Sequence, residues 1–136
     1  MPARDRALSL LSRRDYSRAE LATKLTSEGF STSEVDDAMA HVVRYAGMDD
    51  QALAERLTQK LQNRGYGAAK VVAELAKRGL EAVVDDGEDV ARARAAWADV
   101  CDKYQGRWQA AAGYLSRRGF SEETIQRVLP EQETAE

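Results

Sequence analysis

The sequence contains one pattern three times, and this internal repeat limits the folds that the chain can adopt. In residues 16–30, 63–80 and 106–120, apolar residues at helical spacing are followed by a glycine and then at once by another apolar residue. The three endings are Gly29-Phe30, Gly79-Leu80 and Gly119-Phe120. Each repeat takes up roughly a third of the chain, and helical units of that size bury little core alone. Neighbouring repeats must therefore either share buried surface or tolerate mobility.

Local signals at the start of these segments predict where helices begin. Ser17 and Glu20 have the spacing of a capping box, in which the serine hydroxyl and the glutamate carboxylate satisfy free backbone N–H groups. Ser31 and Glu34 repeat this spacing before the next apolar stripe. In the second copy, Gly67 takes the place of Ser17. We therefore expect helices to start directly after these three positions.

The recurring glycines predict how the same helices end. Gly29 suits the left-handed position that follows many helices, because it has no Cβ. Leu25 and Phe30 would then make the apolar contact of a Schellman motif across it. The ending at Gly79 has the same arrangement of leucine, glycine and apolar residue.

Composition and spacing together predict an all-α protein made of tandem three-helix repeats. Charged residues make up 32% of the chain and there are only two prolines, which suits solvated helices better than a sheet. We expect repeat 1 over residues 1–47, repeat 2 over 48–87 and repeat 3 over 88–130, followed by a disordered acidic tail, 131–136. The middle repeat is expected to be truncated, with a short or missing third helix, because the segment 81–89 is rich in acids.

The net charge and the single cysteine limit which partners and which cellular compartment we expect for the chain. The net charge is −3, from 20 basic against 23 acidic residues, which is not the strongly basic balance of a dedicated nucleic-acid binder. A single cysteine excludes an intrachain disulfide and fits a reducing compartment. The sequence has no apolar run that could cross a membrane and no signal-peptide core at its start, so we expect a cytoplasmic protein with no membrane partner.

The residues that could carry chemistry do not form a catalytic or metal-binding pattern. His41 is the only histidine and has no partner at ligand spacing, so surface or boundary packing is the better interpretation. Cys101 is expected to be a small buried residue. Asp49-Asp50 is predicted to cap a helix, and Asp85-Asp86 to lie in a solvated turn. We therefore expect no enzymatic activity, no metal site and no cofactor.

Several short motifs, in this order and spacing, resemble those of the RecX family of bacterial regulatory proteins from about residue 4 to residue 129. They are Ser17-Arg18-Ala19-Glu20-Leu21, Gly29-Phe30, Gly47-Met48-Asp49-Asp50, Arg64-Gly65-Tyr66-Gly67, Arg78-Gly79-Leu80 and Leu115-Ser116-Arg117-Arg118-Gly119-Phe120. Each motif alone is weak, because helix caps are common, but the series is specific.

The resemblance implies an elongated, curved array of three-helix repeats that binds in the groove of the RecA filament on DNA. It implies inhibition of the ATPase, strand-exchange and coprotease activities of RecA in recombination and the SOS response. It also implies a non-enzymatic protein, which we expect to be a monomer with at most weak direct contact to DNA.

Basic residues and one tyrosine near the recurring glycines are the candidate partner-binding residues. They are Arg14, Arg18, Arg64, Tyr66, Lys70, Lys77, Arg78, Arg117 and Arg118. Compensation of the helix dipole could explain about half of the basic ones. Alternatively, they form a periodic ridge for a periodic partner, in which several weak contacts add together. Tyr66 could equally be a staple buried in its own repeat.

Two other functions remain open at this point. A helical module could bind nucleic acid without RecA, since three-helix units can present a helix to a groove, and it would then show a steep dependence on salt. A helical-repeat adaptor for another protein would explain the packing equally well.

Overall fold

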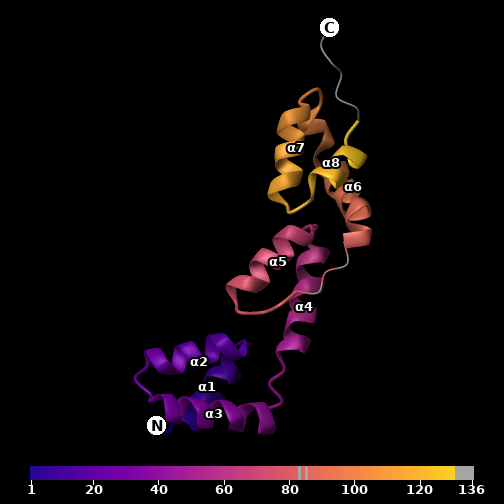
Figure 1. Ribbon diagram of the computed structural model, residues 1–136. Helices are drawn as coiled ribbons and strands as arrows, with labels where there is room; N and C mark the ends of the chain where they lie inside the picture. The colour runs from indigo at the N-terminus through magenta and orange to yellow at the C-terminus, as the bar shows by residue number, and fades with distance from the viewer. Residues whose placement is uncertain (83, 85, 131–136) are drawn as a thin grey trace. The chain divides into compact units, whose positions relative to one another are not determined.

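The computed structural model describes residues 1–82, 84 and 86–130, and within these ranges all regular structure is helical (Figure 1). The described helices are α1 (Ala3–Arg13), α2 (Arg18–Ser27), α3 (Thr32–Tyr45), α4 (Asp50–Asn63), α5 (Ala68–Lys77), α6 (Asp89–Val100), α7 (Trp108–Arg117) and α8 (Glu122–Val128). Two short 3₁₀ segments, η1 (Asp86–Glu88) and η2 (Cys101–Tyr104), flank α6. The all-α expectation is confirmed for this part of the chain.

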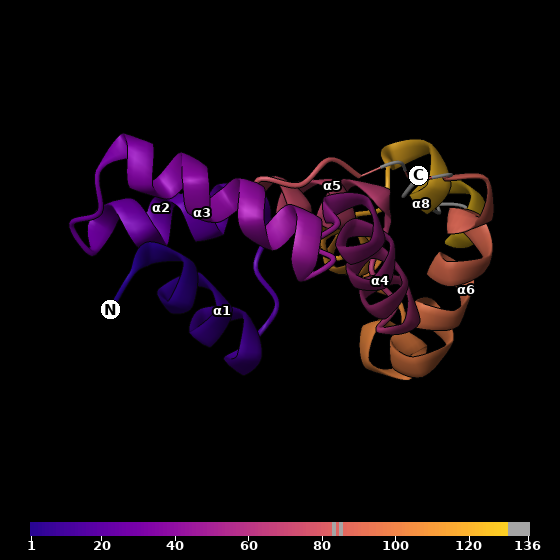
Figure 2. The same ribbon diagram turned by 90° about the horizontal axis from the view of Figure 1, so that it is seen from below.

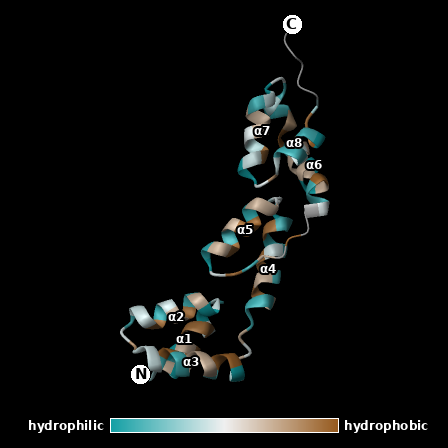
Figure 3. Cartoon of the chain, viewed as in Figure 1, coloured by the Kyte–Doolittle hydropathy of each residue, from teal (hydrophilic) through white to brown (hydrophobic). Residues whose placement is uncertain are grey.

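The chain forms two compact units, and the division runs through α4 and α5. Unit 1 comprises residues 1–56 and 75–81, and unit 2 comprises residues 57–74 with the described residues from 82 onward. Each unit has its own core, as expected for amphipathic helices in which polar and apolar residues alternate along the ribbon (Figure 3).

The core of unit 1 lies between α1, α2 and α3, which pack side by side in both ribbon views (Figures 1 and 2). Leu10, Leu21, Leu25 and Val42 are buried there, and they come from all three helices. Leu21 and Leu25 lie four residues apart on α2, and the buried residues of α1 and α3 are likewise three or four positions apart, so each helix directs one face inward.

The core of unit 2 is built mainly by α6, α7 and α8. Leu115 is fully buried, and Phe120, Ile125 and Leu129 are nearly so. Alanines of α6 and α7, including Ala93 and Ala111, let these helices approach closely because their side chains are small.

The predicted helix ends are confirmed by their hydrogen bonds. At Gly29, the Phe30 N–H donates to the Leu25 carbonyl at 3.3 Å and the Gly29 N–H donates to Thr26 at 3.1 Å, the bond pair of a Schellman motif. The same pair recurs at Gly79 and at Gly119. The same pair of hydrogen bonds also closes α4 at Gly65, a position for which no such ending was predicted.

The predicted helix starts are also present. Both capping boxes, at Ser17 and at Ser31, are complete. Of the two acids proposed to cap α4, Asp49 does so, since its carboxylate accepts from the N–H groups of Gln51 and Ala52 at 3.0 and 3.2 Å. Asp50 has a different role, described below.

The structure differs from the prediction at Cys101, in the segment that precedes α7. The helix α6 ends at Val100 and the chain continues as the tighter η2. Cys101 therefore lies half-buried in η2 instead of in the core. Residues 83 and 85, where the middle repeat was expected to lose its third helix, and the expected acidic tail at 131–136 lie outside the described residues. The boundaries of the three repeats stay a prediction.

Candidate partner-binding surface

The start of α2 is covered by two later segments of unit 1. The hydroxyl of Ser17, which is fully buried, accepts from the Glu20 N–H at 3.1 Å and donates to the Arg78 carbonyl oxygen. The first N–H of α2, on Arg18, donates to the Asp50 carboxylate at 2.9 Å. The C-terminal turn of α5 and the first residue of α4 thus both dock on the helix start of the preceding repeat.

Arg78 strengthens this contact through a half-buried ion pair. Its guanidinium lies 3.0 Å from a Glu20 carboxylate oxygen and also donates to the Asp15 carbonyl at 3.0 Å. Arg14 approaches the same carboxylate at 3.1 Å. Burial by itself would raise the pKa of Glu20, but hydrogen bonds from Arg78 and the Ser17 N–H, with the two arginine charges, bring that pKa below its usual value. Arg78 is therefore engaged in holding the repeats of unit 1 together.

The start of α5 in unit 2 is covered in the same way. The Gly67 N–H donates to the Arg118 carbonyl at 2.8 Å, and the Ala69 N–H donates to the Gly119 carbonyl at 3.1 Å. The first N–H of α5, on Ala68, donates to the carboxylate of Asp89 at 3.0 Å. Because Gly67 has no side chain to cap the helix, this buried carboxylate from the first residue of α6 supplies the acceptor.

Arg118 fills the place in unit 2 that Arg78 fills in unit 1. Its guanidinium donates to the Arg64 carbonyl and lies over the Tyr66 ring, 4.5 Å from the ring centroid. Lys70 pairs with Glu74 at 3.2 Å and also approaches the Tyr66 ring. Tyr66 is therefore half-buried within unit 2, beneath the guanidinium of Arg118 from the segment after α7. Arg118 makes a second contact between repeats, as Arg78 does in unit 1.

The nine candidate residues therefore divide into two groups. Four are half-buried in the contacts just described, namely Tyr66, Lys70, Arg78 and Arg118. Five have exposed side chains, namely Arg14, Arg18, Arg64, Lys77 and Arg117. We call these five the exposed cations.

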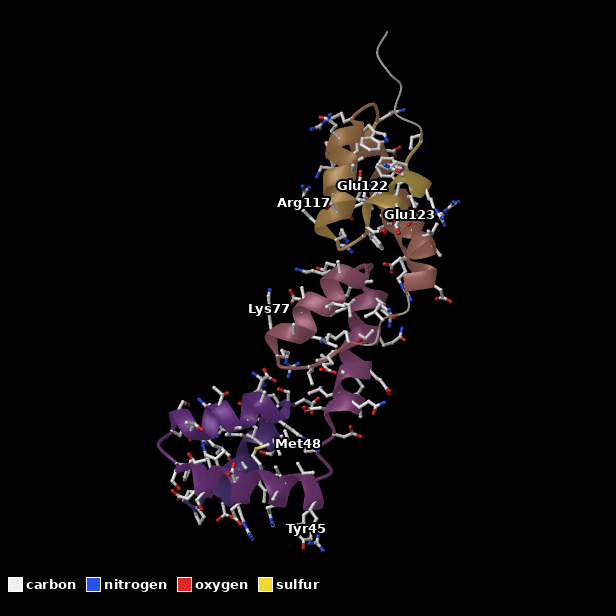
Figure 4. The ribbon with its side chains drawn as sticks, in the orientation of Figure 1. Tyr45, Met48, Lys77, Arg117, Glu122 and Glu123 are labelled. Atoms are coloured by element: carbon white, nitrogen blue, oxygen red, sulfur yellow. The ribbon has the colours of Figure 1, made fainter. Side chains whose placement is uncertain are left out.

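Among the exposed cations, Lys77 and Arg117 are the last residues of α5 and α7, and they directly precede Arg78 and Arg118 in the sequence. Figure 4 labels both side chains, and the Arg117 guanidinium lies along the surface of α7, 3.2 Å from where a Cβ at Gly113 would stand. Arg117 makes no ion pair with any residue in the described ranges. In repeat 1 the position equivalent to Arg78 and Arg118 is occupied by Glu28, which forms an ion pair with Arg6 at 2.6 Å.

Sequence reasoning missed the part played by Asp50 and Asp89. Each is the first residue of its helix and caps a different helix 32 or 21 residues away. The signal was the recurrence of an aspartate at the start of α4 and α6, but an acid there normally indicates a cap for its own helix.

Among residues 1–82, 84 and 86–130, no cluster of three or more histidine, cysteine, aspartate or glutamate side chains could hold a metal ion. None of the helices in these ranges is long and apolar enough to cross a membrane.

Comparisons with known proteins give a consistent family. Residues 3–41 match the family model described as RecX, first three-helix domain. The regulatory protein RecX of Legionella pneumophila (strain Corby) is 31% identical over 138 residues, covering 93% of this chain and 92% of the relative. That of Acidithiobacillus ferrooxidans (strain ATCC 53993 / BNL-5-31) is 33% identical, covering 90% and 85%. That of Stenotrophomonas maltophilia (strain K279a) is 39% identical over 86% of this chain, which spans 64% of the length of that relative.

The fold has a counterpart among solved structures. The crystal structure of RecX from Lactobacillus salivarius superposes with a TM-score of 0.78 and covers 93% of this chain and 91% of that one. The sequence identity is 18%, so this similarity concerns the fold alone. It confirms the expected array of helical repeats.

Proposed function

Because this chain belongs to the RecX family, we propose that it is a non-enzymatic cytoplasmic regulator that binds along the RecA filament on DNA. Binding lowers the ATPase, strand-exchange and coprotease activities of RecA in recombination and the SOS response. The chain acts as a monomer and requires no cofactor.

The observation that supports this proposal is the separation of the basic residues at the helix ends. Arg78 and Arg118 are committed to contacts inside the protein, whereas the residues directly before them, Lys77 and Arg117, are exposed. Compensation of the helix dipole does not require two consecutive basic residues at the C-terminal end of α5 and again at that of α7. In each pair the arginine before the glycine stabilises a contact between repeats, and the residue before it has an exposed side chain that can meet an acidic surface repeating along a filament.

The strength of such binding depends on the number of contacts made together. A single exposed ion pair contributes about 0.2–1 kcal/mol in salt, which is too little to hold a complex. Contacts that are made in register on one partner add because the later ones form within a complex that already exists. The five exposed cations could therefore supply a few kcal/mol in total and make binding sensitive to salt.

The direct test is the steady-state ATPase rate of RecA on single-stranded DNA, measured with increasing amounts of this protein. We expect the rate to fall in a saturable manner. An unchanged rate at a large excess of protein, at low as well as physiological salt, would overturn the proposal.

The main alternative is direct binding to nucleic acid without RecA, which the exposed side chains of Arg18, Arg64 and Arg117 would also suit. It predicts binding to single- or double-stranded DNA that weakens steeply as salt increases, because phosphate contacts release counterions. Filter binding without RecA separates the two functions. A steep salt dependence with no effect on RecA turnover would favour the alternative.

A further inference from the structure

Unit 2 contains a cavity of about 890 Å³ whose wall is formed by the start of α7. Every residue from 104 to 111 lines it, and Trp97, Leu129 and Pro130 complete the apolar side. Trp97 and Trp108 are the only tryptophans of the chain, and both lie at this cavity. The Trp108 indole N–H donates to the Pro130 carbonyl at 3.0 Å, which fixes one wall.

The position of this cavity corresponds to the two docking contacts already described. Counting back from the repeated glycines, residues 104–110 are equivalent to 14–20 and 64–70. In those two segments the first N–H of the helix binds a carboxylate from the next repeat, Asp50 or Asp89. Within the part of the chain that the structure describes, no residue binds the equivalent N–H, on Trp108.

The third repeat differs from the other two in the residue at its cap position. The cap position, held by Ser17 and Gly67 in the earlier repeats, is Arg107. Its side chain is exposed, makes no ion pair with any described residue and does not cap α7. An arginine beside the unsatisfied first turn of a helix favours a carboxylate, which can accept from the backbone N–H and from the guanidinium together.

We propose that this cavity binds an acidic segment of a partner protein, in which a carboxylate caps α7 and pairs with Arg107 while an adjacent apolar side chain packs between Trp97 and Trp108. A protein segment is favoured because the two equivalent sites are filled by protein segments that bring a carboxylate to the same N–H. A nucleic-acid backbone fits less well, since the charged lining consists of one cation, Arg107, and one acid, Asp102. This site is independent of the proposed action on RecA.

The two tryptophans make the test direct, because both line this cavity and no other tryptophan contributes to the emission. The probe is a blocked peptide that combines aspartate and leucine, and the matched control peptide has asparagine in place of aspartate. We expect a saturable change in emission with the acidic peptide. Arg107→Ala should weaken binding about tenfold or more, while Arg94→Ala, which removes an exposed arginine of α6 outside the cavity lining, should leave it unchanged.

Backbone amide shifts provide the second measurement. The acidic peptide should move the ¹H–¹⁵N signals of Trp108 and the two residues after it, and the asparagine peptide should not. The proposal is overturned if millimolar acidic peptide moves neither these signals nor the emission. It is also overturned if oligo-dT binds the site more tightly than the peptide. Shifts at residues 108–110 that grow with protein concentration alone would identify a second copy of the chain as the occupant and would likewise refute it.

Discussion

Replacement of Gly67 by alanine tests the docking contact between repeats in unit 2. A Cβ at this position would lie 2.5 Å from the Gly119 carbonyl oxygen and 2.6 Å from a ring carbon of Phe120. Ordinary contacts of a Cβ begin near 3.4 Å. The obstructing atoms belong to the backbone and to a buried ring, so they cannot move aside as the end of a long side chain could.

The expected cost follows from the geometry. Forcing a methyl group into a closely packed contact costs about 1–3 kcal/mol. Separating the segments also weakens the hydrogen bonds from Gly67 to Arg118 and from Ala69 to Gly119, each worth about 1 kcal/mol net. The reduced freedom of the unfolded chain returns about 0.4–1 kcal/mol. We therefore expect Gly67→Ala to lower the free energy of unfolding of unit 2 by about 3 kcal/mol.

The assay is urea unfolding followed by tryptophan emission, because both tryptophans belong to unit 2. With a typical urea dependence of about 1–3 kcal/mol per molar, the midpoint should fall by about 1–3 M. Gly113→Ala is the matched control. Gly113 lies within α7, where an added Cβ meets only the flexible end of Arg117 at 3.2 Å, so alanine should raise stability by about 0.5–1 kcal/mol.

A free energy of unfolding for Gly67→Ala within 0.5 kcal/mol of that of the unaltered protein would refute the reasoning. It would mean that the C-terminal turn of α7 does not rest on the start of α5 in solution. A loss of the same size for Gly113→Ala would point to a general intolerance of unit 2 instead of this contact.

Three further substitutions or conditions test other contacts between repeats. Asp89→Ala should cost about 2 kcal/mol in the urea assay, because it removes a buried charged acceptor, and Asp89→Asn should cost less because an acceptor oxygen remains. The pKa of Glu20 is lowered in the folded protein, so its ion pair with Arg78 stabilises unit 1 at a pH above the usual glutamate pKa, and this stabilisation is lost as the pH falls through the lowered pKa. Hydrogen exchange of the α2 amides should therefore become faster on acidification, and Glu20→Gln should make that rate less dependent on pH. Gly79→Ala should lower the melting temperature more than Gly29→Ala, measured by far-UV circular dichroism, because both glycines have positive φ but only Gly79 has close neighbours where a Cβ would be added. An equal fall in melting temperature for the two variants would argue against close packing at Gly79.

The local structures that could be predicted are those determined by residues close together in the sequence. The capping boxes at Ser17 and Ser31 and the endings at Gly29 and Gly79 each depend on residues within one helical turn, so spacing alone identified them. The early change from α6 to η2 was not evident, because apolar spacing across Cys101 suits either helix type.

The contacts between repeats could not be predicted, because they join residues far apart in the chain. Arg78 and Glu20 are 58 residues apart, and the sequence showed only that both belong to recurring motifs. For the same reason Arg78 and Arg118 could not be distinguished from their exposed neighbours Lys77 and Arg117. A glycine at position 67 could be interpreted as a cap, but its close approach to Gly119 required the fold.

The proposed role of the exposed cations is tested most directly by the affinity of charge-reversed variants for RecA filaments on single-stranded DNA, measured by co-sedimentation. Reversing Lys77 and Arg117 together to glutamate should weaken binding about tenfold or more, since two attractive contacts become repulsive. Reversing Arg94 and Arg127 together makes the same change of charge at exposed positions outside the candidate set and should have little effect. Equal affinity of the Lys77 and Arg117 double variant and the unaltered protein, with helicity intact in both, would contradict the account.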